Sequence, residues 1–127
     1  MTAIPEQYHN MLSSKALAHL ATIMPNGSPH VSPVWFDYDG EHIRINTASG
    51  RQKDRNMRRN PRVALSIVDP NEPERALNIR GLVVEISDDP ELKHMNGLTR
   101  RYRGDDWTPV PGQVRVVYKI RPDHISS

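Results

Sequence analysis

The segment SGRQKDRNMRRNP, residues 49–61, concentrates positive charge in a chain whose formal net charge is only +2 at pH 7. Six cations lie in this segment or directly after it: Arg51, Lys53, Arg55, Arg58, Arg59 and Arg62. Asp54 is the one acidic residue among them. Guanidinium and ammonium groups gathered in this way bind phosphates and carboxylates, so the segment is a candidate anion-binding site.

The same segment also carries the signals of a helix. Ser49 is a suitable N-cap, and Gln52 three residues later completes the pattern of a capping box. Asn60–Pro61 predicts the end of the helix, because a residue before proline avoids helical backbone angles. Arg51 and Lys53 then fall in the first turn, where they oppose the positive end of the helix dipole. A phosphate bound at the backbone N–H groups and the Ser49 hydroxyl would remove this conflict.

A nucleic-acid surface is the alternative explanation for these cations, with Trp35, Tyr102 and Trp107 as stacking platforms for bases. Aromatic residues make up only 6% of the chain, and no strand alternates basic with aromatic residues. We therefore expect no nucleic-acid partner. The arginines after Lys53 are interpreted as a solvated helix face.

Motifs for autonomous catalysis or metal binding are missing from the sequence. The six histidines show no i, i+4 pairing with other ligands, so no metal site is expected. His19 is interpreted as a packed core or interface residue. Asp88–Asp89 suits a helix cap, and no residue is assigned as acid or base, although His30 is the strongest candidate. The chain lacks the nucleophile elbow, the Walker loop and the dinucleotide fingerprint, so a cofactor would have to supply redox chemistry.

Length and composition indicate one domain, residues 1–127. The absence of cysteine excludes disulfides and thiolate metal sites. The first ten residues lack the features of a signal peptide, and no apolar run approaches the roughly 20 residues of a membrane span. We expect a cytoplasmic protein without membrane contact.

Six apolar or alternating runs predict strands, at residues 15–24, 29–39, 41–48, 62–69, 75–87 and 113–120. Asn26–Gly27 and Asp39–Gly40 predict hairpin turns, because these residues tolerate positive φ. Pro33 cannot donate to a ladder, so its strand needs an edge, a bulge or a bound group there. Gly81 predicts a bulge or bend in the longest strand.

Two further helices are predicted, at residues 5–14 and 88–104. Tyr8, Met11 and Leu12 recur at helical spacing in the first, and Pro90 suits the first helical position of the second. Sequential hairpin-linked strands with few helices favour a mostly β (α+β) fold, a six-stranded antiparallel β-barrel with small flanking helices.

The stretch from Leu17 to about Gly81 resembles the pyridoxamine 5′-phosphate oxidase-like, FMN-binding split β-barrel family, and within it the branch that binds the deazaflavin coenzyme F420. The pattern consists of LAT, then NG-PH-SPVWF, a DG turn, and R-K-RN--R-P. This resemblance implies a homodimer with two cofactor sites at the subunit interface. The oxidases that form pyridoxal carry basic residues near their C-terminus that this chain does not match, so vitamin B6 oxidation is not expected.

The resemblance also implies which residues touch the cofactor. The expected contacts with the tricyclic ring are His30, Ser32, Pro33 and Val34. Asn46 and Thr47 would flank the ribityl chain. The expected phosphate contacts are Arg51, Gln52 and Lys53. Asn78 and Arg80 could approach the ring from the fifth strand.

The resemblance predicts a reductase that transfers a hydride from reduced coenzyme F420 to a double bond or carbonyl of a small organic substrate. Two alternatives remain open from the sequence. One is an FMN-dependent oxidoreductase on the same fold, and the other is a non-catalytic protein that carries F420.

Overall fold

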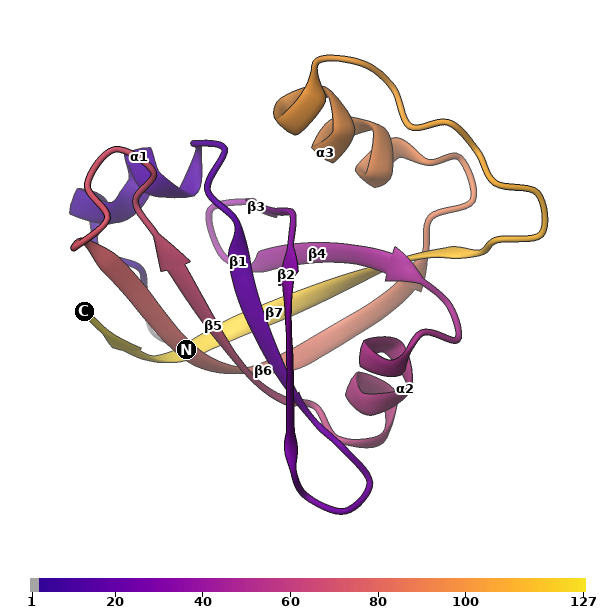
Figure 1. Ribbon diagram of the computed structural model, residues 1–127, viewed down its shortest axis with the longest axis horizontal. Helices are drawn as coiled ribbons and strands as arrows, with labels where there is room; N and C mark the ends of the chain where they lie inside the picture. Colours follow the sequence, from indigo (N-terminus) through magenta and orange to yellow (C-terminus); the bar gives the residue numbers. More distant parts are fainter. Residues whose placement is uncertain (1–2) are drawn as a thin grey trace.

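The computed structural model describes residues 3–127, and its strands form one curled antiparallel sheet (Figure 1). The strands are β1 (Ala18–Ile23), β2 (Pro29–Val34), β3 (Phe36–Tyr38), β4 (Ile43–Ala48), β5 (Arg62–Val68), β6 (Ala76–Asp88) and β7 (Arg115–Ser126). Across the sheet the order is β2-β1-β5-β6-β7-β4-β3. The expected mostly β, split-barrel architecture is confirmed.

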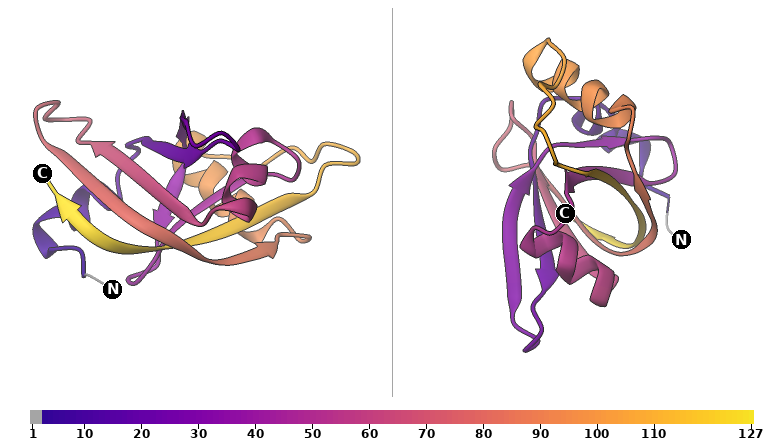
Figure 2. Two further views of the ribbon diagram at one scale, coloured as in Figure 1. Left: turned by 90° about the horizontal axis from the view of Figure 1, so that it is seen from below. Right: turned by 90° about the vertical axis from the view of Figure 1, so that its right-hand side faces the viewer.

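Residues 29–38 form both edge strands of the sheet. β2 pairs with β1 at one edge and β3 pairs with β4 at the other, and only Trp35 separates β2 from β3 in the chain. The sheet therefore curls until the same stretch of chain lies at both edges, as the end-on view in Figure 2 shows. We expected residues 29–39 to be one strand of six, and the break at Trp35 makes the count seven. Pro33 lies on an edge strand, as its missing N–H predicts.

Glycine sets the geometry at two of the predicted places. Gly27 has φ +88° in the loop that joins β1 to β2, a conformation in which glycine has no steric penalty. The pairing of β6 with β7 shifts register between Arg80 and Gly81, as predicted for a bulge. A Cβ at position 81 would collide with the carbonyl oxygen of Arg121 on β7, so only glycine lets the strands approach this closely.

The hydrophobic core fills the inside of the curled sheet. Phe36, Ile43, Ile45, Tyr118 and Ile120 are fully buried there. A short helical segment closes one end, formed by the 3₁₀ turn η1 (Glu6–Tyr8) and α1 (His9–Leu12). Its side chains at positions 8, 11 and 12 are buried, as the helical spacing predicts.

Two longer helices lie outside the sheet: α2 (Gln52–Arg59), between β4 and β5, and α3 (Lys93–Arg103), between β6 and β7. We expected Pro90 to be the first helical residue of α3, but the helix begins at Lys93 after Leu92, whose φ is +58°. Asp89 still caps this end, because its carboxylate accepts hydrogen bonds from the backbone N–H of His94 and Met95. Within residues 3–127, no helix has the length and apolar character needed to span a bilayer.

Candidate functional site

Helix α2 begins two residues later than a Ser49 cap would place it. Arg51 is the N-cap residue, and no side chain forms a capping hydrogen bond there, so the predicted capping box is wrong. Gly50, with φ +93°, turns the chain into the helix, and its N–H donates to Asp54 Oδ2 at 2.8 Å. A carboxylate inside the helix therefore holds the loop that carries Arg51.

Lys53 reaches from the first turn of α2 to the edge strand β2. Its Nζ donates a hydrogen bond to Ser32 Oγ at 3.2 Å, so the structure brings together two residues that were predicted for one site. Burial lowers the pKa of the half-buried Lys53 amine, and Arg51 and Arg115 lower it further. This amine is a cation held among other cations.

Arg115 is a member of this cluster that the sequence did not reveal. It begins β7 opposite Ala48, is only 6% exposed, and donates from Nε to Asn46 Oδ1 at 3.0 Å. Its guanidinium also lies over the Trp107 ring, 5.0 Å from the centroid. Burial lowers the pKa of Arg115. The charge of Arg51 lowers this pKa further, and Asp89 raises it in partial compensation. Alternation along the last strand gave only the weak signal that position 115 faces away from Val116.

Arg51, Lys53 and Arg115 therefore form one group of cations, which we call the cation cluster. Within residues 3–127, none of the three forms an ion pair with a carboxylate. The structure gives the Arg51 guanidinium no hydrogen-bond partner in that range. Uncompensated cations that repel one another favour binding of an anion.

The later arginines of the segment lie on the outer face of α2, as the solvated-face interpretation predicts. Each of them contacts neighbouring groups of the protein. Arg55 donates to the Gly50 carbonyl and to Gln52, Arg58 pairs with Asp54 at 2.8 Å, and Arg59 donates to the carbonyl of Ile23. These contacts stabilise α2 and its attachment to β1.

Gln52 lies beside the cluster, but its side chain follows the helix. It donates to Asn56 Oδ1 at 2.8 Å and accepts from Arg55. The structure therefore gives this predicted phosphate contact a helix-stabilising role.

The four residues predicted to contact the ring do not share one face of β2. His30, Ser32 and Val34 alternate onto the face shared with the buried residues of β1, whereas Pro33 is exposed on the opposite face, across from His19. His19 is itself exposed, so it is not a core residue, and its alternative interpretation as an interface residue stays a prediction. His30 Nδ1 is buried and has no hydrogen-bond partner among the described residues.

Asn46 and Thr47 are neighbours on β4, and strand alternation sends them to opposite faces. Asn46 is buried and its amide is fully engaged, donating to Asp89 Oδ2 at 3.2 Å, lying 3.1 Å from His94 Nδ1 and accepting from Arg115. The buried Oγ1 of Thr47 has no partner in residues 3–127. Asn46 thus orients Arg115, whereas Thr47 is only 1% exposed and its hydroxyl does not face an open cavity.

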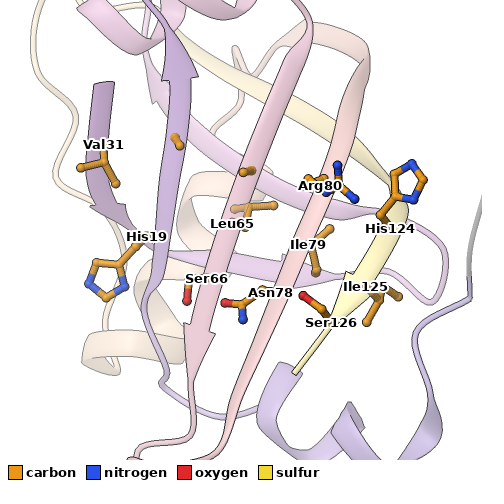
Figure 3. A pocket seen from close by; sticks show the side chains of 12 residues that line it. His19, Val31, Leu65, Ser66, Asn78, Ile79, Arg80, His124, Ile125 and Ser126 are labelled. Atoms are coloured by element: carbon orange, nitrogen blue, oxygen red, sulfur yellow. The ribbon is translucent and has the colours of Figure 1, made fainter. Parts of the chain in front are cut away.

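The outer face of the sheet carries two adjoining cavities of 390 and 460 Å³, separate from the cation cluster. Figure 3 shows the first, where side chains such as Leu65 and Ile79 lie between Val31 and His19 on one side and Arg80 and His124 on the other. Arg80 is directly opposite His124 in the β6–β7 pairing. Asn78 and Arg80 line this cavity, whereas none of the nine principal predicted contacts does.

No group of three or more histidine or acidic side chains in residues 3–127 is arranged to hold a metal ion. The cation cluster is therefore the candidate for the functional site, as a place where an anion could bind.

Comparisons with known proteins give the family of the chain. The sequence profile described as pyridoxamine 5′-phosphate oxidase matches residues 4–127. The chain is 36% identical over 121 residues to the F420H(2)-dependent biliverdin reductase of Mycobacterium tuberculosis, covering 90% of this chain and 80% of that protein.

Solved structures with this fold include a protein that is also described as an F420 reductase. A structure described as an F420 reductase superposes with a TM-score of 0.88 at 41% identity, covering 97% of this chain and 98% of the other. A conserved hypothetical protein of M. tuberculosis superposes with a TM-score of 0.76 at 28% identity, covering 96% and 82%.

Proposed function

Because this chain belongs to the pyridoxamine 5′-phosphate oxidase family, we propose that it is an oxidoreductase that binds coenzyme F420 and reduces a small organic substrate. Relatives named for F420-dependent reduction support this cofactor over FMN. When bound, the reduced deazaflavin supplies a hydride for a double bond or carbonyl of the substrate.

The single observation that carries the proposal is the cation cluster beside Ser32. Arg51 and Lys53 have no carboxylate partner among the residues that the structure describes, and Lys53 already contacts the strand expected to lie along the cofactor ring. These residues fit the phosphate of a flavin-like cofactor, with Arg51 supplying a planar fork of donors and Lys53 a point charge.

The protein's own contribution is binding and alignment. The cation cluster holds the anionic end of the cofactor, and β2 limits where the rest can lie. Neither the sequence nor the geometry assigns a side chain as proton donor, so we propose that solvent supplies the proton that accompanies the hydride.

We further propose that two copies of the chain form the complete site. The outer-face cavities lie on the sheet surface, and Val31, which lines the first of them, is an apolar side chain that is 66% exposed in the single chain. A second copy packed there would cover this face and add residues such as Asn78 and Arg80 to the cofactor pocket.

A fluorescence titration of the purified protein with coenzyme F420 and, in parallel, with FMN tests the proposal. Tighter binding of F420, followed by substrate-dependent oxidation of the reduced cofactor, supports a reductase. Biliverdin is the first substrate to test, because it is the one named for a relative. Tighter binding of FMN supports the FMN-dependent alternative, F420 binding without turnover supports the carrier, and binding of neither refutes the cofactor assignment.

A further inference from the structure

The dipeptide Asn-Gly occurs twice in this chain, and the structure places the two copies in different surroundings. Asn26–Gly27 lies in the loop between β1 and β2, which projects beyond the sheet with residues 25–29 exposed (Figure 1). Asn96–Gly97 lies inside helix α3, where Asn96 is half-buried. In Asn-Gly the following backbone nitrogen reaches the asparagine side chain easily, because glycine has no Cβ to obstruct it. The two copies therefore compare one reaction in two conformations.

Ser28 polarises the side-chain amide of Asn26. Its backbone N–H donates to Asn26 Oδ1 at 3.0 Å, and its hydroxyl donates to the same oxygen at 2.6 Å. Two donors on one carbonyl oxygen stabilise the negative charge that develops there when a nucleophile adds to the carbon. The bond from the Ser28 N–H also closes an Asx turn, which folds the side chain back along the main chain beside the Gly27 peptide group.

Asn96 has different contacts. Its Oδ1 accepts a hydrogen bond from the backbone N–H of Trp107 at 2.9 Å, which directs the side chain toward the loop after the helix. Attack by the Gly97 nitrogen would require the hydrogen bonds of α3 to open and the helix to unwind. At Asn26 the obstacle is a turn hydrogen bond in an exposed loop, from the Gly27 N–H to the Met24 carbonyl at 2.9 Å. Opening this bond costs far less than unwinding a packed helix.

We propose that Asn26 is a modification site that deamidates in the folded protein with assistance from Ser28. The Gly27 nitrogen gives its proton to water and attacks Asn26 Cγ, and the new C–N bond closes a succinimide ring. Ammonia leaves with the electron pair of the broken C–N bond and takes up a proton from water. Water then adds to one of the two ring carbonyls and breaks its bond to the nitrogen, which leaves aspartate or isoaspartate at position 26. Water is the only co-reactant.

The modification has consequences for the elements that the loop connects. Isoaspartate carries an extra carbon in the main chain between β1 and β2, and this loop sets the register in which the two strands pair. Met24 at the start of the loop contacts α2, with its sulfur 3.4 Å from Asn56 Nδ2, and Ser32 of β2 accepts the hydrogen bond of Lys53. Deamidation should therefore weaken the packing of α2 against β1 and β2.

The test follows both asparagines in the full chain during incubation at mildly alkaline pH. Peptide mass spectrometry measures deamidation at Asn26 and Asn96 over several weeks, and isoaspartyl methyltransferase labels the isoaspartate product. The same incubation in guanidinium chloride gives both rates without the fold. Ser28→Ala removes the hydroxyl donor, and Ser13→Ala, at an exposed serine after α1, is the matched control. Circular dichroism checks the folding of both variants.

We expect Asn26 to deamidate several-fold faster than Asn96 in the folded protein, and the difference to narrow in guanidinium chloride. Ser28→Ala should slow the reaction at Asn26 several-fold in the folded protein, whereas Ser13→Ala should not change it. Equal rates at Asn26 and Asn96 in the folded protein, or an unchanged rate at Asn26 in folded Ser28→Ala, would overturn the proposal. Neither cofactor nor substrate enters the reaction, so its outcome is independent of the F420 titration.

Discussion

The hydroxyl of Tyr118, in the middle of strand β7, donates a hydrogen bond to the carboxylate of Asp54 in the first turn of helix α2. Both side chains are buried, and the same carboxylate accepts from the Gly50 N–H and from Arg58. Burial raises the pKa of Asp54, but these three donors outweigh burial and hold it below its usual value. The barrel interior thus fixes the loop on which Arg51 stands.

Tyr118→Phe removes one donor from a buried carboxylate and leaves the ring in place. We expect the free energy of unfolding to fall by about 1.5–3 kcal/mol, the typical value for a hydrogen bond to a charged group. Urea denaturation measures it. Tyr38→Phe is the matched control, because its hydroxyl donates to the Gly40 carbonyl at an exposed position. Equal losses in the two variants would contradict a special role for the Tyr118–Asp54 bond.

Arg51→Ala should weaken binding of F420, or of any phosphate ligand, by about 1.5–3 kcal/mol for each charge-assisted hydrogen bond lost. Its effect on folding should be small, since the Arg51 side chain has no partner among the described residues. Isothermal titration gives the affinity and thermal denaturation gives the stability. Lys93→Ala, an exposed lysine of α3, is the control. An unchanged affinity in Arg51→Ala would remove Arg51 from the site.

Lys53→Met should stabilise the protein in the absence of ligand while weakening anion binding. The folded state holds the Lys53 pKa below its unfolded value of 10.5, so folding disfavours the bound proton and the protonated amine costs stability at neutral pH. We expect a gain of about 0.5–1 kcal/mol at pH 7, small because solvent screens a half-buried charge.

The pH dependence provides the check on Lys53. As pH rises through the lowered pKa of the folded state toward 10.5, the wild type loses the unfavourable proton and the two proteins should converge in stability. Urea denaturation at neutral and alkaline pH measures this difference. A variant that is less stable than wild type at pH 7 would show that the Ser32 hydrogen bond outweighs the charge repulsion.

Arg115→Leu removes the buried cation and leaves Asn46 Oδ1 without its donor. The cost of an unsatisfied buried acceptor predicts a loss of about 1–3 kcal/mol in the free energy of unfolding. Anion affinity should fall as well. Arg103→Leu is a suitable control, since Arg103 is an exposed residue of α3 whose contacts are a surface ion pair with Asp105 at 3.4 Å and a position 6.0 Å from the centroid of the Trp35 ring. Retained anion affinity in a folded Arg115→Leu would exclude Arg115 from the cluster.

Gly81→Ala tests the bulge that brings β6 against β7. The added Cβ would collide with backbone of β7, so we expect a loss of at least about 2 kcal/mol or failure to fold. Gly97→Ala in α3 meets no atom within 4 Å and should stabilise by up to about 1 kcal/mol through helix propensity. Thermal denaturation of both variants makes the comparison, and similar behaviour would contradict the close approach.

Local features of this protein could be predicted from its sequence, because each depends on a few consecutive residues. Asn26–Gly27, Gly81 and Asn60–Pro61 mark the hairpin, the bulge and the end of α2 through backbone angles that other residues disfavour. The excess of cations at Arg51 and Lys53 was visible for the same reason. It predicted an anion site without any knowledge of which residues lie opposite.

Only the tertiary structure decided which residues meet there. Ser32 and Lys53 are 21 positions apart, and Asp54 and Tyr118 are 64 positions apart. Arg115 joins the cluster because β7 pairs with β4. These contacts depend on how the sheet closes through residues 29–38, and a break of one residue at Trp35 sends the two halves of that stretch to opposite edges. Register between distant strands is set by the packing of the whole core, so no short stretch of sequence encodes it.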